Sequence, residues 1–377
     1  MPMQQIDKIV HYSREHKTWL QSDAICQYIL YGPHYPLKDS EPQKHKLNAC
    51  AFLSLENPAE LCRFLDTSII LLEEIINEPD YKHYTIKKKR GGQRHIFAPE
   101  EQLKQIQIRL NYFLQGYYLW IKPAEVHGFV INPQYLGVHC NIVANAAVHT
   151  GKKHILNIDL KDFFPSISAK RIKTLFTSPY FNFSEQVATA LTLLTTFQAR
   201  LPIGAPTSPV LSNFVCLTLD ENLRIFCMKN GLQFSRYADD LTFSSDTIIS
   251  QDTIQHIIEL IRENGFEINK KKLRLQSSSR KQTVTGLTVN EKVNVDRKLL
   301  KKIRAMLHDF TTNGIEVATK RHFNLKKIDN YRQQGRFIHR LEGYINFVGQ
   351  VRGKDDIIYQ KLKQPFDALF NKKTVNL

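Results

Sequence analysis

Two adjacent acids, Asp239 and Asp240, stand between two segments whose composition is typical of β-strands, 233–238 and 241–245. The pair therefore occupies the tight turn of a predicted hairpin. Like charges at a hairpin tip repel each other and weaken the ends of both strands. Two divalent cations bridged by carboxylates would compensate for that repulsion. Because Asp-Asp is also an ordinary turn pair, these residues alone leave a catalytic and a purely structural interpretation open.

A third acid, Asp159, lies near the end of the alternating segment 154–160. The alternation predicts a strand with an apolar face and a polar face, and Asp159 belongs to the polar face. Mg²⁺ prefers oxygen ligands, and two such ions about 4 Å apart can stabilise both the attacking and the leaving oxygen of a phosphoryl transfer. Asp159 and the Asp239-Asp240 pair are therefore candidates for a two-metal centre.

Helical and strand-like patterns elsewhere indicate the fold class. Apolar residues at helical spacing predict helices over 60–77, 100–120, 184–197, 209–230 and 254–264. Gly91-Gly92 predicts the turn of a basic hairpin over 84–97. Around the three acids the order is strand, helix, helix, hairpin, helix. This order predicts an α+β fold in which a small sheet carries helices on one face.

The chain is strongly basic, with 52 Lys and Arg against 36 Asp and Glu in 377 residues, a net charge of +16. More than half of the excess lies from Asp296 onward, where 18 basic residues face 8 acidic ones within 82 residues. A protein this basic usually binds a polyanion, and nucleic acid is a stronger candidate than an acidic membrane surface. A solvated basic surface is the alternative.

Composition also excludes several classes of protein. Hydrophobic residues make up 42% of the chain, which excludes a disordered or fibrous protein. The six cysteines are scattered without Cys-x-x-Cys spacing, which argues against a zinc site and fits reduced thiols. No apolar run is long enough for a secretory signal or a membrane span. We therefore expect a cytoplasmic protein without a membrane partner.

The motifs and their order resemble those of the reverse transcriptases. The segment 157–167 is similar to the first catalytic motif of that family, and Tyr237-Ala238-Asp239-Asp240 resembles its Tyr-x-Asp-Asp box. Two finger motifs, the nucleotide-pocket loop and two later motifs are matched in family order by 87–94, 127–129, 204–209, 265–272 and 286–290. The resemblance covers roughly residues 85–310. It implies an RNA-directed DNA polymerase with a right-hand fold, in which fingers and palm interleave and the thumb is helical.

The same resemblance implies catalytic roles for single residues. Asp159, Asp239 and Asp240 match the catalytic ligands of two Mg²⁺ ions, and Asp162 is a weaker candidate. Phe164 matches the bulky gate that excludes a ribose 2′-hydroxyl, and a core phenylalanine is the alternative.

The implied contacts to the deoxynucleoside triphosphate involve six residues: Lys88, Arg94, Phe164, Gly204, Ala205 and Lys272. The bidentate guanidinium of an arginine and the compact ammonium of a lysine both suit a triphosphate. A solvated basic hairpin is the alternative for Lys88 and Arg94. Ile203 stands where many relatives carry Gln, which puts one side-chain contact to the nucleotide in doubt.

Two shorter elements resemble those of bacterial retron reverse transcriptases: Asn145-Ala146-Ala147-Val148-His149 and Val284-Thr285-Gly286. A capping or core-bonded histidine is the alternative for His149, and a strand bulge is the alternative for Gly286. The retron resemblance implies a structured noncoding RNA from the same locus as template. It also implies priming from an internal guanosine 2′-hydroxyl, a branched RNA–DNA hybrid (msDNA) and an effector protein that acts with it against phage.

Other functions remain open from the sequence. Within the same class, the chain could be an intron-type or abortive-infection reverse transcriptase. From another class, it could be a scaffold that binds RNA and neutralises an effector without synthesis. The intact set of three acids argues against an idle site.

The polymerase resemblance also predicts the domains. We expect an N-terminal helical region over 1–80, fingers over 81–158, a palm over 159–295 with finger helices at about 168–200, and a basic helical thumb over 296–377. The thumb should hold RNA and the growing hybrid, and a solvated helix is the alternative. The predicted RNA-binding residues are Asn145, His149, Val284, Thr285, Gly286, Arg297, Lys298, Lys301, Lys302 and Arg304.

Overall fold

The computed structural model describes residues 3–22, 41–88, 91–132, 139–325, 327 and 331–371. The chain divides into two compact units. The first unit consists of residues 1–141, 156–243 and 249–274, and the second consists of 142–155, 244–248 and 275–377. Each unit has its own hydrophobic core. The finer division into fingers, palm and thumb stays a prediction.

The first unit begins with short helices that pack around a large aromatic core. They are α1 (Met3–Glu15), α2 (Lys17–Leu20), α4 (Glu41–Leu53), α5 (Pro58–Leu65) and α6 (Ile69–Asn77). The prediction of one helix over 60–77 was wrong. Asp66 takes a left-handed conformation with φ 52° and ends α5, and Ser68 begins α6 by accepting a hydrogen bond from Leu71 N at 3.1 Å. The apolar spacing continues across this break, which is why periodicity alone does not detect it.

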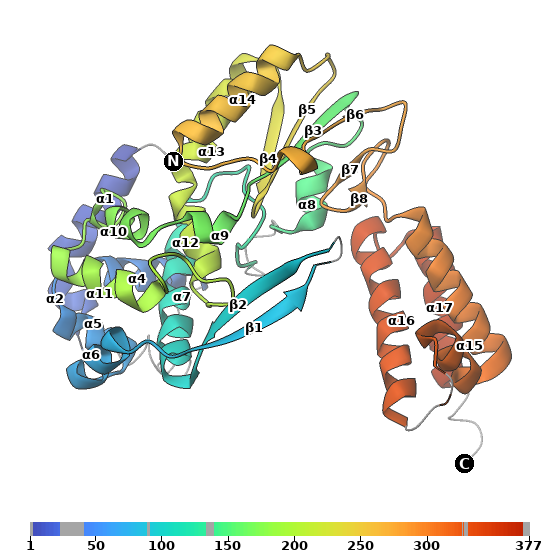
Figure 1. The fold of residues 1–377 in the computed structure, drawn as a ribbon, viewed down its shortest axis with the longest axis horizontal. Coiled ribbons are helices and arrows are strands. Elements are labelled where there is room, and N and C mark those ends of the chain that lie inside the picture. Colours follow the sequence, from blue (N-terminus) through green and yellow to red (C-terminus); the bar gives the residue numbers. More distant parts are fainter. Residues whose placement is uncertain are drawn as a thin grey trace. The chain divides into compact units, whose positions relative to one another are not determined.

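The predicted basic hairpin is present and longer than expected. Strands β1 (Tyr81–Lys87) and β2 (Gln93–Pro99) pair antiparallel, with Tyr81 opposite Pro99 and Lys87 opposite Gln93. Helix α7 (Glu101–Ile121) follows, as predicted, and its buried face joins the core of the first unit. Figure 1 shows the hairpin as a long two-stranded arm.

A four-stranded sheet has the order β4-β5-β3-β6. Its strands are β3 (His154–Asp159), β4 (Gln233–Tyr237), β5 (Asp240–Ser245) and β6 (Arg274–Ser277). The predicted strand at 154–160 and the predicted hairpin around the two acids are therefore confirmed. Figure 1 shows α13 (Leu217–Lys229) and α14 (Gln251–Glu263) beside the strands.

The remaining helices of the first unit are α9 (Phe163–Ser166), α10 (Ala169–Thr177), α11 (Glu185–Thr195) and α12 (Ser208–Val215). The predicted single helix over 209–230 was wrong in one respect, because α12 and α13 are separate and meet at Cys216. The five cysteines in the described part of the chain are all buried free thiols, and Cys26 lies outside it.

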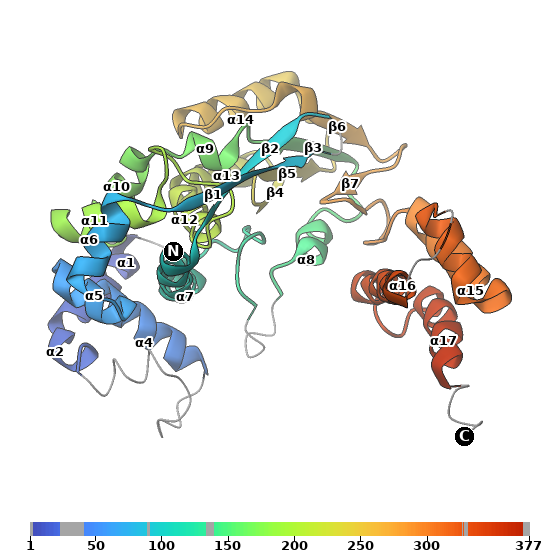
Figure 2. The ribbon, with the colours of Figure 1, turned by 60° about the horizontal axis from the view of Figure 1, so that its bottom comes forward.

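The second unit combines short elements with three long helices. The short ones are α8 (Ile142–Ala147), β7 (Thr283–Val284) and β8 (Leu287–Thr288). The long ones are α15 (Arg297–Phe323), α16 (Tyr331–Arg352) and α17 (Ile357–Asn371), which pack against one another (Figure 2). Gly314, with φ 78°, interrupts α15. The basic C-terminal region is therefore helical, as predicted.

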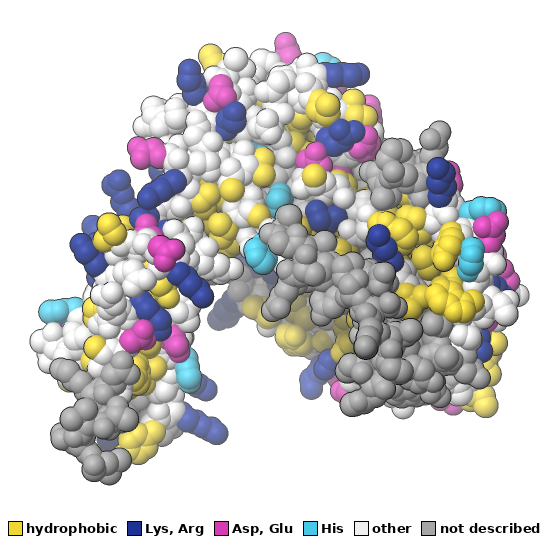
Figure 3. Space-filling model, turned by 180° about the vertical axis from the view of Figure 1, so that it is seen from behind, with side chains coloured by type: hydrophobic (Ala, Val, Ile, Leu, Met, Phe, Trp, Pro, Cys, Tyr) yellow, Lys and Arg dark blue, Asp and Glu magenta, His cyan; other side chains and the backbone are white. Residues whose placement is uncertain are grey.

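Within the described residues, no helix combines the length and the apolar character that a membrane crossing requires. In the space-filling view, Lys and Arg side chains are spread over the surface with acidic ones among them (Figure 3).

Candidate active site

Three carboxylates meet at one end of the neighbouring strands β3 and β5. Asp159 is the last residue of β3, Asp239 lies in the turn after β4, and Asp240 is the first residue of β5. The backbone fixes this arrangement, because Leu160 N donates to Asp239 O at 2.9 Å and Asn269 N donates to Asp159 O at 2.8 Å. The structure therefore brings together the three acids that the sequence predicts as catalytic.

The carboxylates repel one another. Burial raises the pKa of Asp239, and the charge of Asp159 adds to this shift. Burial also raises the pKa of Asp240 to about 6, and the charges of Asp239 and Asp159 contribute. Asp240 itself is exposed, so solvent screens part of this repulsion. A nearby divalent cation would relieve the repulsion that adds to both shifts.

Lys272 supplies a positive charge to this cluster. Its ammonium Nζ lies 2.7 Å from Asp159 Oδ2 and opposes the raised pKa values of Asp239 and Asp240. Lys272 belongs to the short 3₁₀ helix Lys270–Lys272. The prediction that it binds nucleotide stays a prediction, and the structure places it against a carboxylate.

The three carboxylates fit hard divalent cations in donor type and charge. They do not form a closed cage: within the described residues, no three His, Cys, Asp or Glu side chains are placed to hold one ion. Lys272 instead pairs with Asp159. Metal ligation by these residues would therefore require small side-chain movements and competition with Lys272.

The turn that carries Asp239 has a constrained backbone. Ala238 takes a left-handed conformation with φ 59°, which is unfavourable for a residue with a side chain. Gly128 packs directly against it, and a Cβ atom at Gly128 would come within 2.4 Å of Ala238 N. The predicted finger motif 127–129 therefore supports the turn that carries Asp239, and only glycine allows this close approach.

The predicted gate Phe164 is partly buried and packs at the edge of the core. Its ring centroid lies 5.7 Å from that of Phe129 and 5.4 Å from that of Phe163. Phe164 is thus partly accessible and also makes the contacts of a core residue, and its role as a gate stays a prediction. Asp162, the weaker candidate ligand, is exposed and precedes α9.

Gly204 and Ile203 join the hairpin to the rest of the first unit. Phe97 N donates to Ile203 O at 2.8 Å. A Cβ atom at Gly204, where φ is 119°, would lie 2.8 Å from Ile96 Cγ2. This glycine therefore has a packing role that the sequence does not reveal. Ala205, the other predicted pocket residue in this loop, is buried.

The two predicted triphosphate contacts, Lys88 and Arg94, lie on the hairpin and are exposed. Arg94 is close enough to the carboxylates for its charge to oppose the raised pKa of Asp239. Lys88 lies just beyond β1, where its backbone N donates to Gly92 O at 3.0 Å. The hairpin therefore brings at least one cation to the carboxylate cluster.

In the second unit, the two retron-like elements lie together, because α8 contacts both β7 and β8. Thr285 Oγ1 donates to Ile142 O at 3.1 Å. Thr285 and Gly286, with φ 47° and 84°, form the two-residue turn between β7 and β8. Positive φ at both positions is typical of a tight hairpin turn, so the alternative of a strand bulge at Gly286 was wrong.

Three of the predicted RNA contacts in these elements are buried side chains. Asn145, His149 and Val284 are each 0% exposed, and His149 Nδ1 lies 2.7 Å from Ser244 Oγ. Asn145 has no hydrogen-bond partner for its side-chain amide within the described residues. In contrast, Thr285 is half-buried and Gly286 is exposed. The turn is therefore the accessible part of the retron-like elements.

The predicted RNA-binding cations of α15 share the solvent side of that helix. Leu300, Ile303 and Met306 are buried. The exposed basic residues are Arg297, Lys298, Lys301, Lys302 and Arg304. Lys302 Nζ lies 3.3 Å from Tyr344 Oη and 5.0 Å from the centre of its ring, so this cation has an intramolecular partner.

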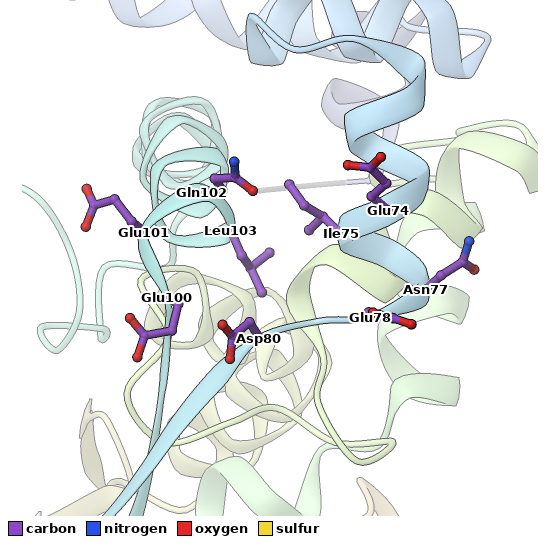
Figure 4. A pocket seen from close by; sticks show the side chains of 9 residues that line it. All are labelled: Glu74, Ile75, Asn77, Glu78, Asp80, Glu100, Glu101, Gln102 and Leu103. Atoms are coloured by element: carbon purple, nitrogen blue, oxygen red, sulfur yellow. The ribbon is translucent and has the colours of Figure 1, made fainter.

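A separate cavity of about 810 Å³ lies among α6, β1 and α7 (Figure 4). Five of the nine residues that line it are acidic: Glu74, Glu78, Asp80, Glu100 and Glu101. None of the predicted site residues lines it. Its negative charge would repel a polyanion, so this cavity is a poor candidate for the nucleic-acid or nucleotide site.

Sequence reasoning missed a buried polar network behind the turn that carries Asp239 and Asp240. Arg236 and Asp220 are almost completely buried, and the guanidinium donates to both carboxylate oxygens at 2.6 and 2.7 Å. Asn213 accepts a further bond from Arg236 at 2.9 Å. One signal was available, because Asp220 lies on the apolar face of a predicted helix and Arg236 lies inside a predicted strand.

A sheet that carries three carboxylates at one end, flanked by a basic hairpin and a loop with a conformationally required glycine, defines the class as a nucleic-acid polymerase of the palm type. The family profile "Reverse transcriptase (RNA-dependent DNA polymerase)" matches residues 86–289. The retron Mx65 reverse transcriptase of Myxococcus xanthus is 35% identical over 325 residues, which cover 79% of this chain and 74% of that protein. The retron Ec86 reverse transcriptase of Escherichia coli is 32% identical, with 67% of this chain and 78% of that protein covered.

The chain therefore belongs to the retron reverse transcriptases, and it is an RNA-directed DNA polymerase with the predicted polymerase fold. Among solved structures, a telomerase from Candida albicans in complex with a fragment of telomeric RNA matches 81% of this chain and 65% of its own, at 11% identity and a TM-score of 0.43. A foamy viral protease-reverse transcriptase in complex with double-stranded DNA matches 78% of this chain and 39% of its own, at 16% identity and a TM-score of 0.40.

Proposed function

We propose that this enzyme copies a structured noncoding RNA from its own locus, starting at an internal guanosine 2′-hydroxyl of that RNA. The product would be a branched RNA–DNA hybrid that acts with an effector protein in defence against phage. The observation that carries this proposal is the combination of the carboxylate centre with two retron-like elements in a chain whose relatives are retron enzymes.

Catalysis would use Asp159, Asp239 and Asp240 as ligands for two Mg²⁺ ions. When bound, these ions would stabilise the negative charge on the attacking and leaving oxygens. The mutual repulsion of the carboxylates supports this assignment, because the pKa values of Asp239 and Asp240 are raised by burial and by neighbouring acids. Lys272 would leave Asp159 as cations bind and would then be available to an anionic nucleotide oxygen.

Nucleotide selection would depend on Phe164 and on the basic hairpin. The partly buried Phe164 ring packs against Phe129 and Phe163, and these contacts would hold its accessible part in a defined position. A ribose 2′-hydroxyl would collide with such an edge, whereas a deoxyribose would not. Lys88 and Arg94 would hold the triphosphate, with the arginine as a bidentate hydrogen-bond donor. Gly204 and Ala205 would form the floor of the pocket.

Recognition of the RNA would belong to the second unit. Thr285 and Gly286 present an accessible tight turn, and Asn145, His149 and Val284 lie in the interior that supports it. We assign the RNA contacts to the turn and to the exposed cations of α15, and a supporting role to the three buried residues. Contacts of this kind read the shape and backbone of a folded RNA.

The test is to purify the full chain from its native host and to sequence the nucleic acid that accompanies it. The proposal expects single-stranded DNA joined to RNA through a 2′,5′ linkage, which a debranching enzyme separates. Purification of the Asp239→Asn variant is the matched control, and it should yield the same RNA without DNA.

Two results would contradict the proposal. Recovery of only unrelated cellular RNA with the wild-type protein would remove the retron assignment. Full phage protection by the Asp239→Asn variant together with its effector would favour an RNA-binding scaffold that acts without synthesis.

A further inference from the structure

The buried network behind the catalytic turn connects three consecutive elements, α12, α13 and β4. Arg236 on β4, Asp220 on α13 and Asn213 on α12 form its polar core. Arg236 is 0% exposed, and its guanidinium donates to Asp220 Oδ1 at 2.6 Å, to Asp220 Oδ2 at 2.7 Å and to Asn213 Oδ1 at 2.9 Å.

The fourth acceptor of this guanidinium lies in the catalytic turn. Arg236 Nη1 donates to the carbonyl oxygen of Ala238 at 3.2 Å. Ala238 directly precedes Asp239 and holds the unfavourable φ of 59°. The next carbonyl, that of Asp239, accepts from Leu160 N at 2.9 Å. Two consecutive peptide groups of the turn are therefore fixed, one by Arg236 and one by Leu160, the residue that follows β3.

The network also fixes the segment 127–128, which packs against the turn. Asn213 Nδ2 donates to Gly128 O at 3.0 Å, and His127 N donates to the backbone oxygen of Arg236 at 3.0 Å. Gly128 in turn leaves no room for a side chain beside Ala238. The left-handed conformation of Ala238 is thus enclosed on both sides, which is how a strained backbone persists.

We propose that Arg236 is a positioning residue for the catalytic turn, which it holds through the Ala238 carbonyl while the carboxylate of Asp220 fixes the orientation of the guanidinium. Its effect on the reaction passes through the placement of Asp239 and Asp240. The inference rests on the proposed metal-binding role of these acids.

Charge explains why an arginine occupies this position. Burial, the largest single effect, would lower the pKa of Arg236, but Asp220 together with Cys216 and Tyr118 outweighs burial and raises it, so the guanidinium keeps its charge. Burial also raises the pKa of Asp220, and the guanidinium opposes that shift. We take both groups as ionised, because a neutral Asp220 would leave a buried cation without compensation. A lysine could pair with Asp220 but has no planar fork to reach the other acceptors.

The test uses two variants that separate positioning from stability. Arg236→Lys keeps a cation but loses the planar fork. The double variant Asp220→Leu/Arg236→Met replaces the ion pair with apolar side chains of similar size, a change that often leaves a fold stable. Arg352→Lys is the control, because Arg352 makes the same two-bond contact with Asp356, at 2.8 and 2.9 Å, outside the catalytic turn.

Three quantities are measured for the full chain: the melting temperature, Mn²⁺ binding without nucleotide by calorimetry, and the Mg²⁺ dependence of primer extension. For Arg236→Lys we expect weaker Mn²⁺ binding and a higher half-saturating Mg²⁺ concentration, each by about tenfold or more. The double variant should show the same defects at a melting temperature near that of the wild type. Arg352→Lys should bind and use metal like the wild type.

Wild-type metal binding and extension in the folded double variant would overturn the inference, and so would wild-type metal dependence in Arg236→Lys. Failure of the proposed function gives a different result, because Asp239→Asn would then still extend primers. An inactive Asp239→Asn variant beside a fully active double variant would therefore refute the positioning role alone.

Discussion

At the turn between β4 and β5, like charges lie close together on a backbone that hydrogen bonds hold on both sides, whereas the cations of α15 lie at exposed positions along a regular helix. The backbone holds the acids of the turn near one another, and burial together with their mutual repulsion raises the pKa values of Asp239 and Asp240. The cations of α15 lie in solvent, and only Lys302 among the five has a described intramolecular hydrogen-bond partner for its side chain, Tyr344. The activity of the turn should therefore depend on where each acid lies, whereas RNA binding by α15 should depend on how many cations it carries.

The largest expected effect is at the turn. Asp239→Asn or Asp240→Asn removes one metal-binding charge but keeps the shape of the side chain. We expect DNA synthesis in Mg²⁺ to fall by at least about 10³-fold, as for other groups that act on the transition state. Primer extension measures this loss. RNA affinity, measured by filter binding, should stay within twofold of the wild type, roughly 0.4 kcal/mol.

Asp162→Asn is the matched control, because Asp162 is an exposed acid that follows β3 yet lies outside the three-carboxylate cluster. It should retain most of the activity. Near-normal extension by either turn variant would instead show that position in the turn does not matter, and the contrast between the two regions would fail.

The second prediction concerns substrate selection beside the turn. Phe164→Ala removes the ring edge that would meet a 2′-hydroxyl, so the preference for deoxynucleotides over ribonucleotides should fall by roughly 10- to 100-fold. The ratio of kcat/KM values for the two nucleotides measures the preference. Deoxynucleotide use should persist.

Phe163→Ala is the control for packing, since Phe163 is buried and its ring contacts that of Phe164. It should lower the melting temperature without admitting ribonucleotides. If Phe164→Ala behaves in the same way as Phe163→Ala, the core interpretation of Phe164 is correct.

The third prediction concerns the second region. Replacing Lys301, Lys302 and Arg304 with Ala should weaken binding to a structured RNA and flatten the dependence of log K on log salt by roughly one unit for each lost phosphate contact. Lys302 also contacts Tyr344, so it should contribute least of the three. Affinity across a salt series measures the slope. The effects of single substitutions should add, because the cations act independently.

A triple replacement of Lys8, Lys170 and Lys229 removes the same charge from exposed positions elsewhere and serves as the control. Its salt slope should match that of the wild type. An unchanged slope in the α15 variant as well would mean that this face is only solvated.

The same contrast explains what the sequence could predict. The strands and helices around the acids could be predicted from alternation and helical spacing. The two adjacent acids indicated a metal centre, because their repulsion destabilises a hairpin tip unless bound cations compensate for it. The breaks at Asp66 and Cys216 interrupt patterns that continue in the sequence, so they were missed. The sequence predicted that the basic residues of α15 lie on a helix, but their spacing fits more than one helix face, and the structure shows that they share the solvent side.

Contacts between distant segments could not be predicted. Nothing local relates Arg236 to Asp220 or Gly128 to Ala238, because these contacts depend on how separate elements pack. The retron-like elements show the same limit. Their resemblance predicted RNA contacts, but only packing reveals that Asn145 and His149 are buried while Gly286 is exposed.

The smallest expected effect is on stability and follows from the raised pKa of Asp240, about 6 in the folded chain against an ordinary value of 3.8. A raised pKa means that the folded state holds the proton more tightly than the unfolded state. The stabilisation is therefore complete below the ordinary value and is lost as pH rises through about 6. Without metal, Asp240→Asn should melt about one to a few degrees above the wild type at pH 7 and lose this advantage near pH 4.

Asp246→Asn is the control, because the pKa of Asp246 is shifted in the opposite direction: the hydrogen bond from Lys152 lowers it. Its melting temperature should not exceed that of the wild type at pH 7. Added Mg²⁺ should raise the melting temperature of the wild type more than that of Asp240→Asn, since only the wild type keeps the full set of repelling carboxylates. If Asp240→Asn melts at the wild-type temperature at every pH, the carboxylates are not strained by their proximity, and the turn then holds its charges as easily as α15 holds its cations.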